Sequence, residues 1–94
     1  MSYSEAYRIP KSVLNSILKK LEKQMKDKEI RGTSRDRGVI VVLSGSFQVL
    51  SVKINQRLLN NHAKLENSVA EAVDDALQKG IQLLKTEAQK LLGK

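Results

Sequence analysis

The sequence contains no cysteine, so neither disulfide bonds nor thiolate metal sites are available to it. A single histidine, His62, stands beside two asparagines, and we expect it to be exposed or to help cap a helix, not to bind metal. The aromatic residues are Tyr3, Tyr7 and Phe47, too few to stack successive bases of a single strand on aromatic platforms. Because no apolar run has the length of a signal peptide or a membrane span, we expect a cytoplasmic protein without a membrane partner.

Recognisable catalytic patterns are missing as well. Asp74 and Asp75 occupy adjacent positions of a predicted helix, so their side chains point about 100° apart and do not form an acid/base pair. Gly32, Gly38 and Gly45 lack the spacing and the following helix of a phosphate-binding loop. We therefore expect no enzymatic activity, no cofactor, no metal ion and no small-molecule substrate.

Positive charge exceeds negative charge, because 17 lysines and arginines stand against 10 acidic residues and give a formal net charge of +7. A basic balance favours polyanionic partners without identifying one. Residues 1–28 carry seven basic and three acidic side chains, whereas residues 55–94 carry six and five. The first predicted helix is therefore the most basic part of the sequence.

The spacing of apolar residues predicts an amphipathic helix from Pro10 to about Lys28. Its apolar positions fall on one side of a helical wheel: Val13, Leu14, Ile17, Leu18, Leu21 and Met25. Lys19, Lys23 and Lys26 lie on the opposite side with Lys20 beside them, and form a basic ridge. The helix pattern alone fits either an ordinary solvated face or a phosphate-binding face.

Three strands are predicted to follow as an antiparallel meander. Ile30–Ser34 has the pattern of a short polar strand, and Arg35–Gly38 forms the next turn, where Gly38 can supply a positive φ. Val39–Leu43 is apolar without alternation, so we expect both faces of this second strand to be covered. Alternation from Phe47 to Ile54 predicts a third strand with one mostly apolar face.

The last part of the sequence is predicted to be helical. Asn55 suits an N-cap before a single helical turn at 56–59. From about Ala63 the apolar spacing predicts one helix of up to about 30 residues, about 45 Å long, whose end projects from so small a domain. Within it, Gly80 either permits a close helix crossing or is tolerated at a cost of about 1 kcal/mol; we prefer the second interpretation.

We expect one domain over residues 1–94, with a flexible segment at 1–9. A domain of this size buries only about 60 to 65% of its unfolded surface, which leaves room for stabilisation by a partner. Even with the apolar side of the first helix packed on the sheet, three strands leave apolar surface uncovered. Either a second copy of the chain covers that surface or the C-terminal helix folds back over it, and the sequence leaves both open.

The order and details of these segments resemble the YbaB/EbfC nucleoid-associated proteins over about residues 13–92. In that family a helix rich in Lys, Gln and Met precedes a short strand with a glycine, a Val-rich strand that closes on a glycine, and a third strand ending in Val-x-Ile. A Leu pair and a long helix follow. The matching segments here are Gln24-Met25-Lys26, Ile30–Ser34, Val39–Gly45, Val52-Lys53-Ile54, Leu58-Leu59 and 65–76, which ends in Asp74-Asp75-Ala76.

The resemblance implies an α+β fold with an N-terminal helix, a three-stranded antiparallel meander, a short helical turn and a long C-terminal helix, in a homodimer with projecting helical arms. It also implies a nucleoid-associated protein that binds duplex DNA with low sequence specificity. On this hypothesis the phosphates are neutralised by cations of the first helix and the segment after it: Lys19, Lys20, Lys23, Lys26, Lys28, Arg31, Arg35 and Arg37. The alternatives are a protein-interaction or scaffold module, whose projecting helices dock on a partner, and an RNA-binding protein.

The sequence departs from the family pattern in three places. Asn55-Gln56 stands where the family usually has Asp-Pro, which we expect to alter only the local turn. The family's glycine-rich turn between strands is here Arg35–Gly38, which adds positive charge at a hairpin tip. The residues after Leu91 lack the Met-, Pro- and Gly-rich tail of many members, so we expect no DNA contact from such a tail.

Overall fold

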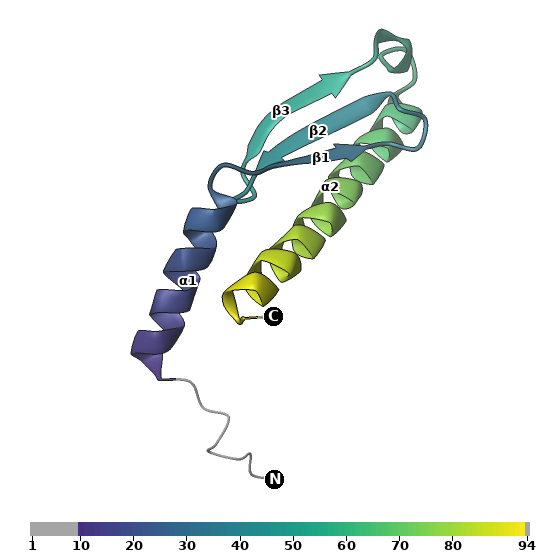
Figure 1. Cartoon of the computed structure of the whole chain (residues 1–94). Helices are drawn as coiled ribbons and strands as arrows, with labels where there is room; N and C mark the ends of the chain where they lie inside the picture. The colour runs from purple at the N-terminus through teal and green to yellow at the C-terminus, as the bar shows by residue number, and fades with distance from the viewer. Residues whose placement is uncertain (1–9, 94) are drawn as a thin grey trace.

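The computed structural model describes residues 10–93, so the segment 1–9, for which we predicted flexibility, and Lys94 lie outside the described residues. The chain has the predicted α+β fold and the predicted order of elements (Figure 1). These elements are α1 (Lys11–Met25), β1 (Glu29–Thr33), β2 (Val39–Ser44), β3 (Val49–Ile54), the 3₁₀ turn η2 (Gln56–Leu58) and α2 (His62–Leu91). Asn55 and Asn61 cap the last two, because their side-chain oxygens accept hydrogen bonds from the backbone N–H groups of Arg57 and Lys64.

The sheet is an antiparallel meander in the order β1-β2-β3. Val41 at the centre of β2 lies opposite Gly32 on β1 and Val52 on β3, and the register between β2 and β3 shifts after Val42. Residues directly opposite each other point to the same face of a sheet. We call the face that carries Val41 the inner face and the opposite one the outer face.

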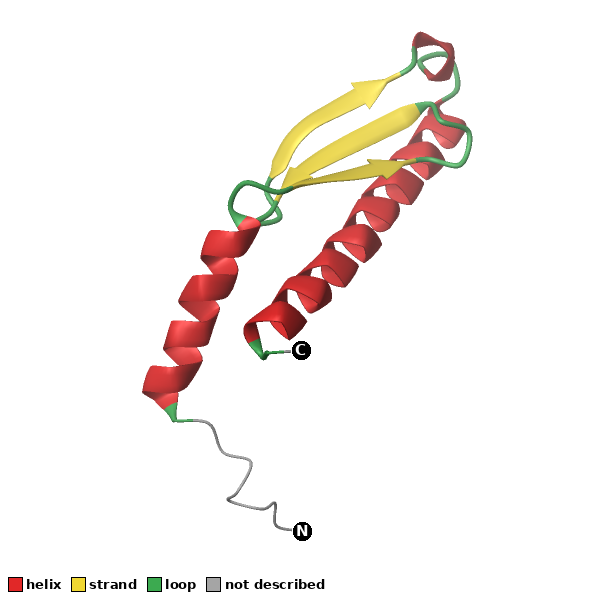
Figure 2. Ribbon diagram, viewed as in Figure 1, coloured by secondary structure: helices red, strands yellow, loops and turns green. Residues whose placement is uncertain are grey.

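Helix α2 covers the inner face with small residues (Figure 2). Its buried positions recur every four residues: Ser68, Ala72, Ala76 and Gly80. Their small size allows β1 to approach closely, since a Cβ on Gly32 would lie 2.2 Å from the Ala72 carbonyl oxygen and 2.4 Å from the Ala76 nitrogen. The core is completed by apolar side chains from the strands and η2: Ile30, Val39, Val41, Leu43 and Leu58.

In the single chain, only the inner face of the second strand is fully covered, so coverage of both faces stays a prediction that would need a partner. Burial alternates along β2: Val39, Val41 and Leu43 are buried, whereas Ile40 and Val42 on the outer face are only half-buried. Five consecutive apolar residues suggested two covered faces, but the outer two are shielded only by neighbouring strands. The C-terminal helix folds back over the inner face, which is one of the two alternatives that the sequence left open.

The first helix does not cover the sheet, contrary to our expectation. Helix α1 leaves the end of the sheet and contacts α2, and both helices project from that end (Figure 1). Its apolar side is therefore only partly covered: Met25 is buried, Ile17 and Leu21 are half-buried, and Leu18 is exposed. The whole described chain is elongated, with extents of 57 × 35 × 20 Å. None of the helices within residues 10–93 has the length and apolar character needed to cross a membrane.

Two carboxylates of α2 occupy the free edge of β1. The Asp75 Oδ2 accepts a hydrogen bond from the Thr33 backbone N–H at 2.9 Å, and the Glu71 Oε1 accepts one from the Arg35 N–H at 3.1 Å. A hydrogen bond from the Lys79 ammonium and that from Thr33 hold the pKa of Asp75 below its usual value. Edge strands normally expose such N–H groups to strand addition, so the Thr33 end of the β1 edge is protected.

The β1–β2 turn is organised around Asp36. Its Oδ1 accepts hydrogen bonds from the Ser34 hydroxyl at 2.7 Å and the Gly38 N–H at 2.8 Å, and its Oδ2 accepts one from the Ser68 hydroxyl of α2 at 2.9 Å. These bonds, that of Ser34 foremost, together with the nearby Arg57 guanidinium, lower the pKa of Asp36 to about 2. The turn is therefore fixed on α2 rather than free.

The positive φ of this turn lies at Arg37, not at Gly38 as predicted. Arg37 has φ 59°, a left-handed conformation that costs an L-residue about 1 to 2 kcal/mol. Gly38 serves packing instead, because a Cβ there would lie 2.4 Å from the Cδ1 of Leu58. A glycine signals a positive φ and a close approach equally, so the sequence could not tell these two roles apart.

Gly80 has close packing neighbours in addition to the tolerated role that we preferred from the sequence. It is buried, and a Cβ there would lie 2.4 Å from the Cε1 of Phe47 and 3.0 Å from the Cδ1 of Ile30. Phe47 reaches it from the β2–β3 turn with a φ of 66°. Gly80 thus allows the side chains of Phe47 and Ile30 to approach α2, and it does not mark the helix crossing that we had considered.

Candidate nucleic-acid interface

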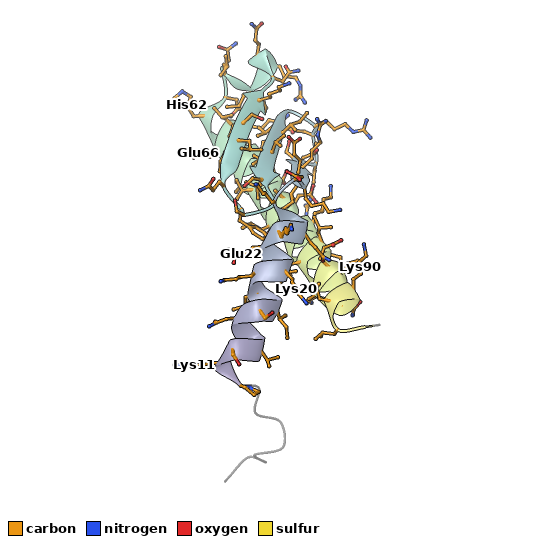
Figure 3. All side chains as sticks on the ribbon, turned by 60° about the vertical axis from the view of Figure 1, so that its left-hand side comes forward. Lys11, Lys20, Glu22, His62, Glu66 and Lys90 are labelled. Atoms are coloured by element: carbon orange, nitrogen blue, oxygen red, sulfur yellow. The ribbon has the colours of Figure 1, made fainter. Side chains whose placement is uncertain are left out.

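The basic ridge of α1 is exposed along its whole length. Lys19, Lys20, Lys23 and Lys26 are all exposed, and none forms an ion pair with another residue of the described range 10–93. Figure 3 places Lys11 and Lys20 of α1 at the same end of the molecule as Lys90 of α2, with His62 and Glu66 at the other end. Free ammonium groups on an exposed helix can bind phosphate oxygens without first breaking an internal ion pair.

Lys23 and Lys26 also border an apolar groove between the two helices. The groove is lined by Leu18, Leu21, Met25, Leu84 and Phe47, among others. Phe47 packs on Gly80 of α2, so the groove lies on the side of the sheet that α2 covers. The groove therefore lies beside the end of the ridge that is nearest the sheet.

Lys28 differs from the other lysines because its charge is partly engaged. Its Nζ lies 4.0 Å from the Glu87 Oε2, which also accepts a hydrogen bond from the Lys90 Nζ at 3.1 Å. Glu87 is only 4% exposed. This ion cluster links the segment after α1 to the end of α2, which gives Lys28 a structural role beside any contact with phosphate.

The three arginines of the predicted site lie apart from α1. Arg31 is exposed on β1 and lies opposite Val42, which places it on the outer face. Arg35 and Arg37 are in the turn at the far end of that strand, and a five-residue strand spans about 16 Å. Arg35 lines a hollow with Glu71, Asp74 and Asp75, three carboxylates that repel phosphate. The eight predicted residues thus form no single surface.

Two cations near the turn were missed by the sequence analysis. Lys53 on β3 lies opposite Ile40, so it points to the outer face, and it lines a hollow together with Arg37. Arg57 donates a hydrogen bond from its guanidinium to the Asp36 carbonyl oxygen and lies 3.9 Å from its carboxylate. The strand alternation could have placed Lys53 on this face, but only the fold brings it beside Arg37.

An uncovered apolar surface runs along the other side of α2. Val52 and Ile54 of β3 lie opposite Val41 and Val39, so they belong to the inner face, yet α2 packs on β1 and β2 and leaves them exposed. On α2 the residues that follow the buried row point away from the β1 edge, toward β3. Together these side chains form the apolar stripe: Val49, Val52, Ile54, Val73, Leu77 and Ile81, each 38 to 63% exposed.

Within residues 10–93 no group of three or more histidine, aspartate or glutamate side chains could hold a metal ion. His62, the first residue of α2, is exposed. The described residues thus present exposed cations on α1 and an uncovered apolar stripe, the two surface features of this small basic protein.

The chain belongs to the YbaB/EbfC DNA-binding family, whose sequence profile matches residues 13–94. It is 32% identical over 75 residues to a nucleoid-associated protein of Prochlorococcus marinus, covering 79% of this chain and 65% of that protein. It is 28% identical over 78 residues to the nucleoid-associated protein TTE0040 of Caldanaerobacter subterraneus, covering 81% and 70% of the two chains. The matched part therefore spans about two thirds of the length of these relatives.

The fold is also found in a crystal structure of the uncharacterized protein HP0035 from Helicobacter pylori. The two structures superpose with a TM-score of 0.73 over 82% of this chain and 92% of the other. Their sequences are 19% identical. This similarity establishes a shared fold and says nothing about activity.

Proposed function

We propose that this chain binds duplex DNA in the nucleoid, as a homodimer, through phosphate contacts with low sequence specificity. The observation that carries the proposal is the row of four exposed lysines on α1, free of ion pairs with described residues, in a member of a DNA-binding family. Two similar proteins are named nucleoid-associated, which supports the proposed location. The contact residues of this site are Lys19, Lys20, Lys23 and Lys26, with Lys28 at its border.

Low sequence specificity follows from the chemistry of these residues. Lysine ammonium groups neutralise phosphates at any sequence, whereas bases are read by side chains inserted into a groove. Among the exposed residues of α1, Asn15 and Gln24 are the only amides, and arginine is absent from this helix. Such a surface positions the protein on the backbone and discriminates weakly between sequences.

The homodimer is supported by the apolar stripe on β3 and α2. Six large aliphatic side chains exposed side by side on a small domain favour association. β3 is also an edge strand, and it has no α2 carboxylates along it comparable to Glu71 and Asp75 on β1. A second copy can cover the stripe and pair with that edge. The dimer would double the formal charge to about +14, which strengthens attraction to a polyanion.

Two triple variants with equal loss of charge test the site. Lys19→Gln, Lys23→Gln and Lys26→Gln change the α1 ridge, whereas Lys79→Gln, Lys85→Gln and Lys90→Gln change α2. We expect the first variant to bind a random duplex at least about tenfold more weakly, since it removes three phosphate contacts per protomer, and the second to bind less than about threefold more weakly. Fluorescence anisotropy at constant salt measures both, and circular dichroism checks that each variant is folded.

A larger loss in the α2 variant would move the contact surface to the long helix and contradict the α1 site. If the unmodified chain failed to bind duplex at low salt, a protein-interaction module would be the better description, because the groove between α1 and α2 and the apolar stripe would remain unexplained. Competition with duplex RNA in the same assay tests the RNA alternative. Stronger binding to RNA would contradict the DNA proposal.

A further inference from the structure

Glu87 is a buried acid at the border of the proposed DNA site. It is 4% exposed and belongs to the part of α2 that projects from the sheet together with α1 (Figure 1). Burying a carboxylate is unfavourable unless cations or N–H groups compensate its charge. A negative charge beside Lys28 also weakens the attraction of this region for phosphate. The presence of Glu87 therefore indicates a role other than attraction of a polyanion.

The contacts of Glu87 differ from those of the α2 acids that hold the sheet edge. Glu71 and Asp75 accept hydrogen bonds from backbone N–H groups. Within the described part of the chain the Glu87 carboxylate instead faces two ammonium groups. Its Oε2 accepts a hydrogen bond from the Lys90 Nζ at 3.1 Å and lies 4.0 Å from the Lys28 Nζ. Lys90 belongs to the same helix as Glu87, so only Lys28 joins this carboxylate to another segment.

Lys28 ends the connector between α1 and β1, which consists of residues 26–28. The last turn of α1 attaches this helix to the rest of the chain. Met25 is the only residue of the helix that is buried, and its carbonyl oxygen accepts a hydrogen bond from the Lys28 N–H at 3.0 Å. Gly45 of the β2–β3 turn lies against the same carbonyl group. Among the described residues, the pair of Lys28 and Glu87 is the one ionic link between this attachment and α2.

The rest of α1 has little support of its own. Val13, Leu14 and Leu18 on its apolar side are exposed. The helix packs on α2 rather than on the sheet, so its direction depends on the attachment at its last turn. Residues at the ends of secondary-structure elements are the usual positions of hinges. The connector is thus the natural hinge of the basic ridge, and the ion pair of Lys28 and Glu87 spans it.

The direction of α1 matters because two basic ridges act together in the proposed homodimer. A duplex is stiff over the size of this protein, since its persistence length is about 150 base pairs. Two ridges bind one duplex at the same time only if their mutual geometry fits it, and that geometry depends on how each α1 is held on its own protomer. A direction that is fixed before binding also lowers the entropic cost of ordering the helix on DNA.

We propose that Glu87 is a positioning residue of the DNA site, which holds the connector on α2 through Lys28 and thereby fixes the direction of the basic ridge. This inference rests on the proposed function, because the ridge is the proposed phosphate-binding surface. Neutralising Glu87 removes a negative charge and releases Lys28, and both changes strengthen attraction to phosphate. Loss of the fixed direction weakens binding. Charge and position therefore predict opposite changes in affinity.

The variant Glu87→Gln separates these two effects. Glutamine keeps the size of the side chain but has no charge with which to hold Lys28. We expect the affinity for a random duplex to fall at least about threefold, although the net charge of the variant is more positive. The control Glu66→Gln removes the same charge from an exposed acid at the opposite end of α2 and should bind at least as tightly as the unmodified chain (Figure 3). Fluorescence anisotropy at constant salt measures both affinities.

A distance measurement tests the direction of α1 itself. Because the sequence has no cysteine, Ser16→Cys on α1 and Gln82→Cys on α2 introduce two unique positions for spin labels, both of them exposed. Double electron–electron resonance without DNA, on labelled chain diluted with unlabelled chain, gives the distance within one protomer. We expect a narrow distribution in the chain with Glu87 and a clearly broader one in Glu87→Gln. Lys28→Gln breaks the same link from its exposed side and should also broaden the distribution, which supplies the test if Glu87→Gln fails to fold.

The possible results separate this inference from the proposed function. No binding of a random duplex by the unmodified chain would remove both. Equal or tighter binding by Glu87→Gln would overturn the positioning role and leave the α1 site standing. Weaker binding with an unchanged distance distribution would also overturn it, because the loss would then not come from the direction of α1. Weaker binding together with a broader distribution supports it.

Discussion

The Asp36 carboxylate accepts a hydrogen bond from the Ser68 hydroxyl at 2.9 Å and so ties the β1–β2 turn to α2. The two residues are 32 positions apart in the sequence. The same carboxylate binds Ser34 and Gly38 within the turn. One ionised group therefore holds a surface turn and a helix together, and its titration should be visible in the stability of the protein.

The stability should fall between about pH 4 and pH 2 in a way that depends on Asp36. Its folded pKa of about 2 lies below the ordinary value of 3.8, so the folded state favours the ionised form. The associated stabilisation is fully present above pH 4 and is lost as the pH falls through the folded pKa. Asp36→Asn should lower the melting temperature at pH 7 by about 5 °C and flatten its dependence on pH in this window.

Thermal unfolding followed by circular dichroism at pH 2 to 7 measures this effect. Asp74→Asn is the control, because Asp74 is an exposed acid of α2 whose side chain contacts only Gln78 in the described hydrogen bonds. An unchanged acid profile in Asp36→Asn would show that the turn is not held by this carboxylate.

Gly32→Ala should be among the most destabilising single-methyl additions in this chain. The new Cβ would lie 2.2 Å from a backbone oxygen and 2.4 Å from a backbone nitrogen of α2, so helix and strand would have to separate. We expect a loss of about 3 kcal/mol or more in the free energy of unfolding, measured by urea titration.

Gly80→Ala provides the comparison for Gly32→Ala. The contacts there are the ends of the Phe47 and Ile30 side chains, which can move, and alanine regains about 1 kcal/mol of helix propensity. The loss at Gly80 should therefore be clearly smaller. An equal loss of stability in both variants would contradict the proposal that Gly32 is needed for the close approach of β1 to α2.

Val52→Glu should dissociate the proposed homodimer without unfolding the chain. Val52 is 48% exposed in the single chain, so a charge there is tolerated in the monomer but would be buried unpaired in the dimer. A cost of about 3 kcal/mol corresponds to an increase of about a hundredfold in the dimer dissociation constant. Light scattering coupled to size exclusion gives the mass over a range of protein concentrations.

The control for Val52→Glu is Gln82→Glu, which adds the same charge at an exposed position of α2. Position 82 follows Gln78 by one turn and lies away from the apolar stripe. It should leave the mass unchanged. A monomeric mass for the unmodified chain at high concentration would contradict the dimer directly.

Binding to duplex DNA should weaken steeply with salt. If the protein neutralises about six phosphates, the logarithm of its association constant should fall with the logarithm of the salt concentration at a slope of about −5. Affinity would then drop by about three orders of magnitude between 50 and 200 mM salt. Titrations of one random duplex at four salt concentrations measure the slope. A slope near zero would exclude phosphate contacts as the source of affinity.

The type and order of the elements could be predicted from the sequence. Apolar spacing placed the ends of α1 within three residues and those of α2 within about one residue of the observed ends, because a period of 3.6 residues is a local signal. Asn55 likewise marked the start of η2 as a local N-cap signal. The sequence pattern did not show which helix packs on the sheet, because that contact joins segments far apart in the chain. Whether α1 or α2 covers the sheet depends on small residues spaced by four, such as Ala72 and Ala76, which contribute little to an apolar pattern yet allow the closest approach.

Of the predicted binding residues, some could be placed from the sequence and others could not. The ridge at Lys19 to Lys26 could be predicted, since the four lysines belong to one helix and their directions follow from its geometry. The surroundings of Arg35 and Arg37 could not. Only the folded chain places carboxylates from α2 beside Arg35 and brings Lys53 from another strand beside Arg37. Arg35 and Arg37 are two positions apart in the sequence, yet Arg35 lies among carboxylates and Arg37 lies beside another cation.

The carboxylates on the β1 edge also limit how large an assembly this sheet can form. Glu71 and Asp75 occupy two N–H groups that an added strand would need, at Thr33 and Arg35, so β3 is the more accessible edge for strand pairing. Two copies joined through β3 would present β1 at both ends of the combined sheet. In the proposed homodimer, the same helix that builds the core would thus disfavour sheet growth beyond two copies, which would help to protect a protein with an uncovered apolar strand against fibril formation.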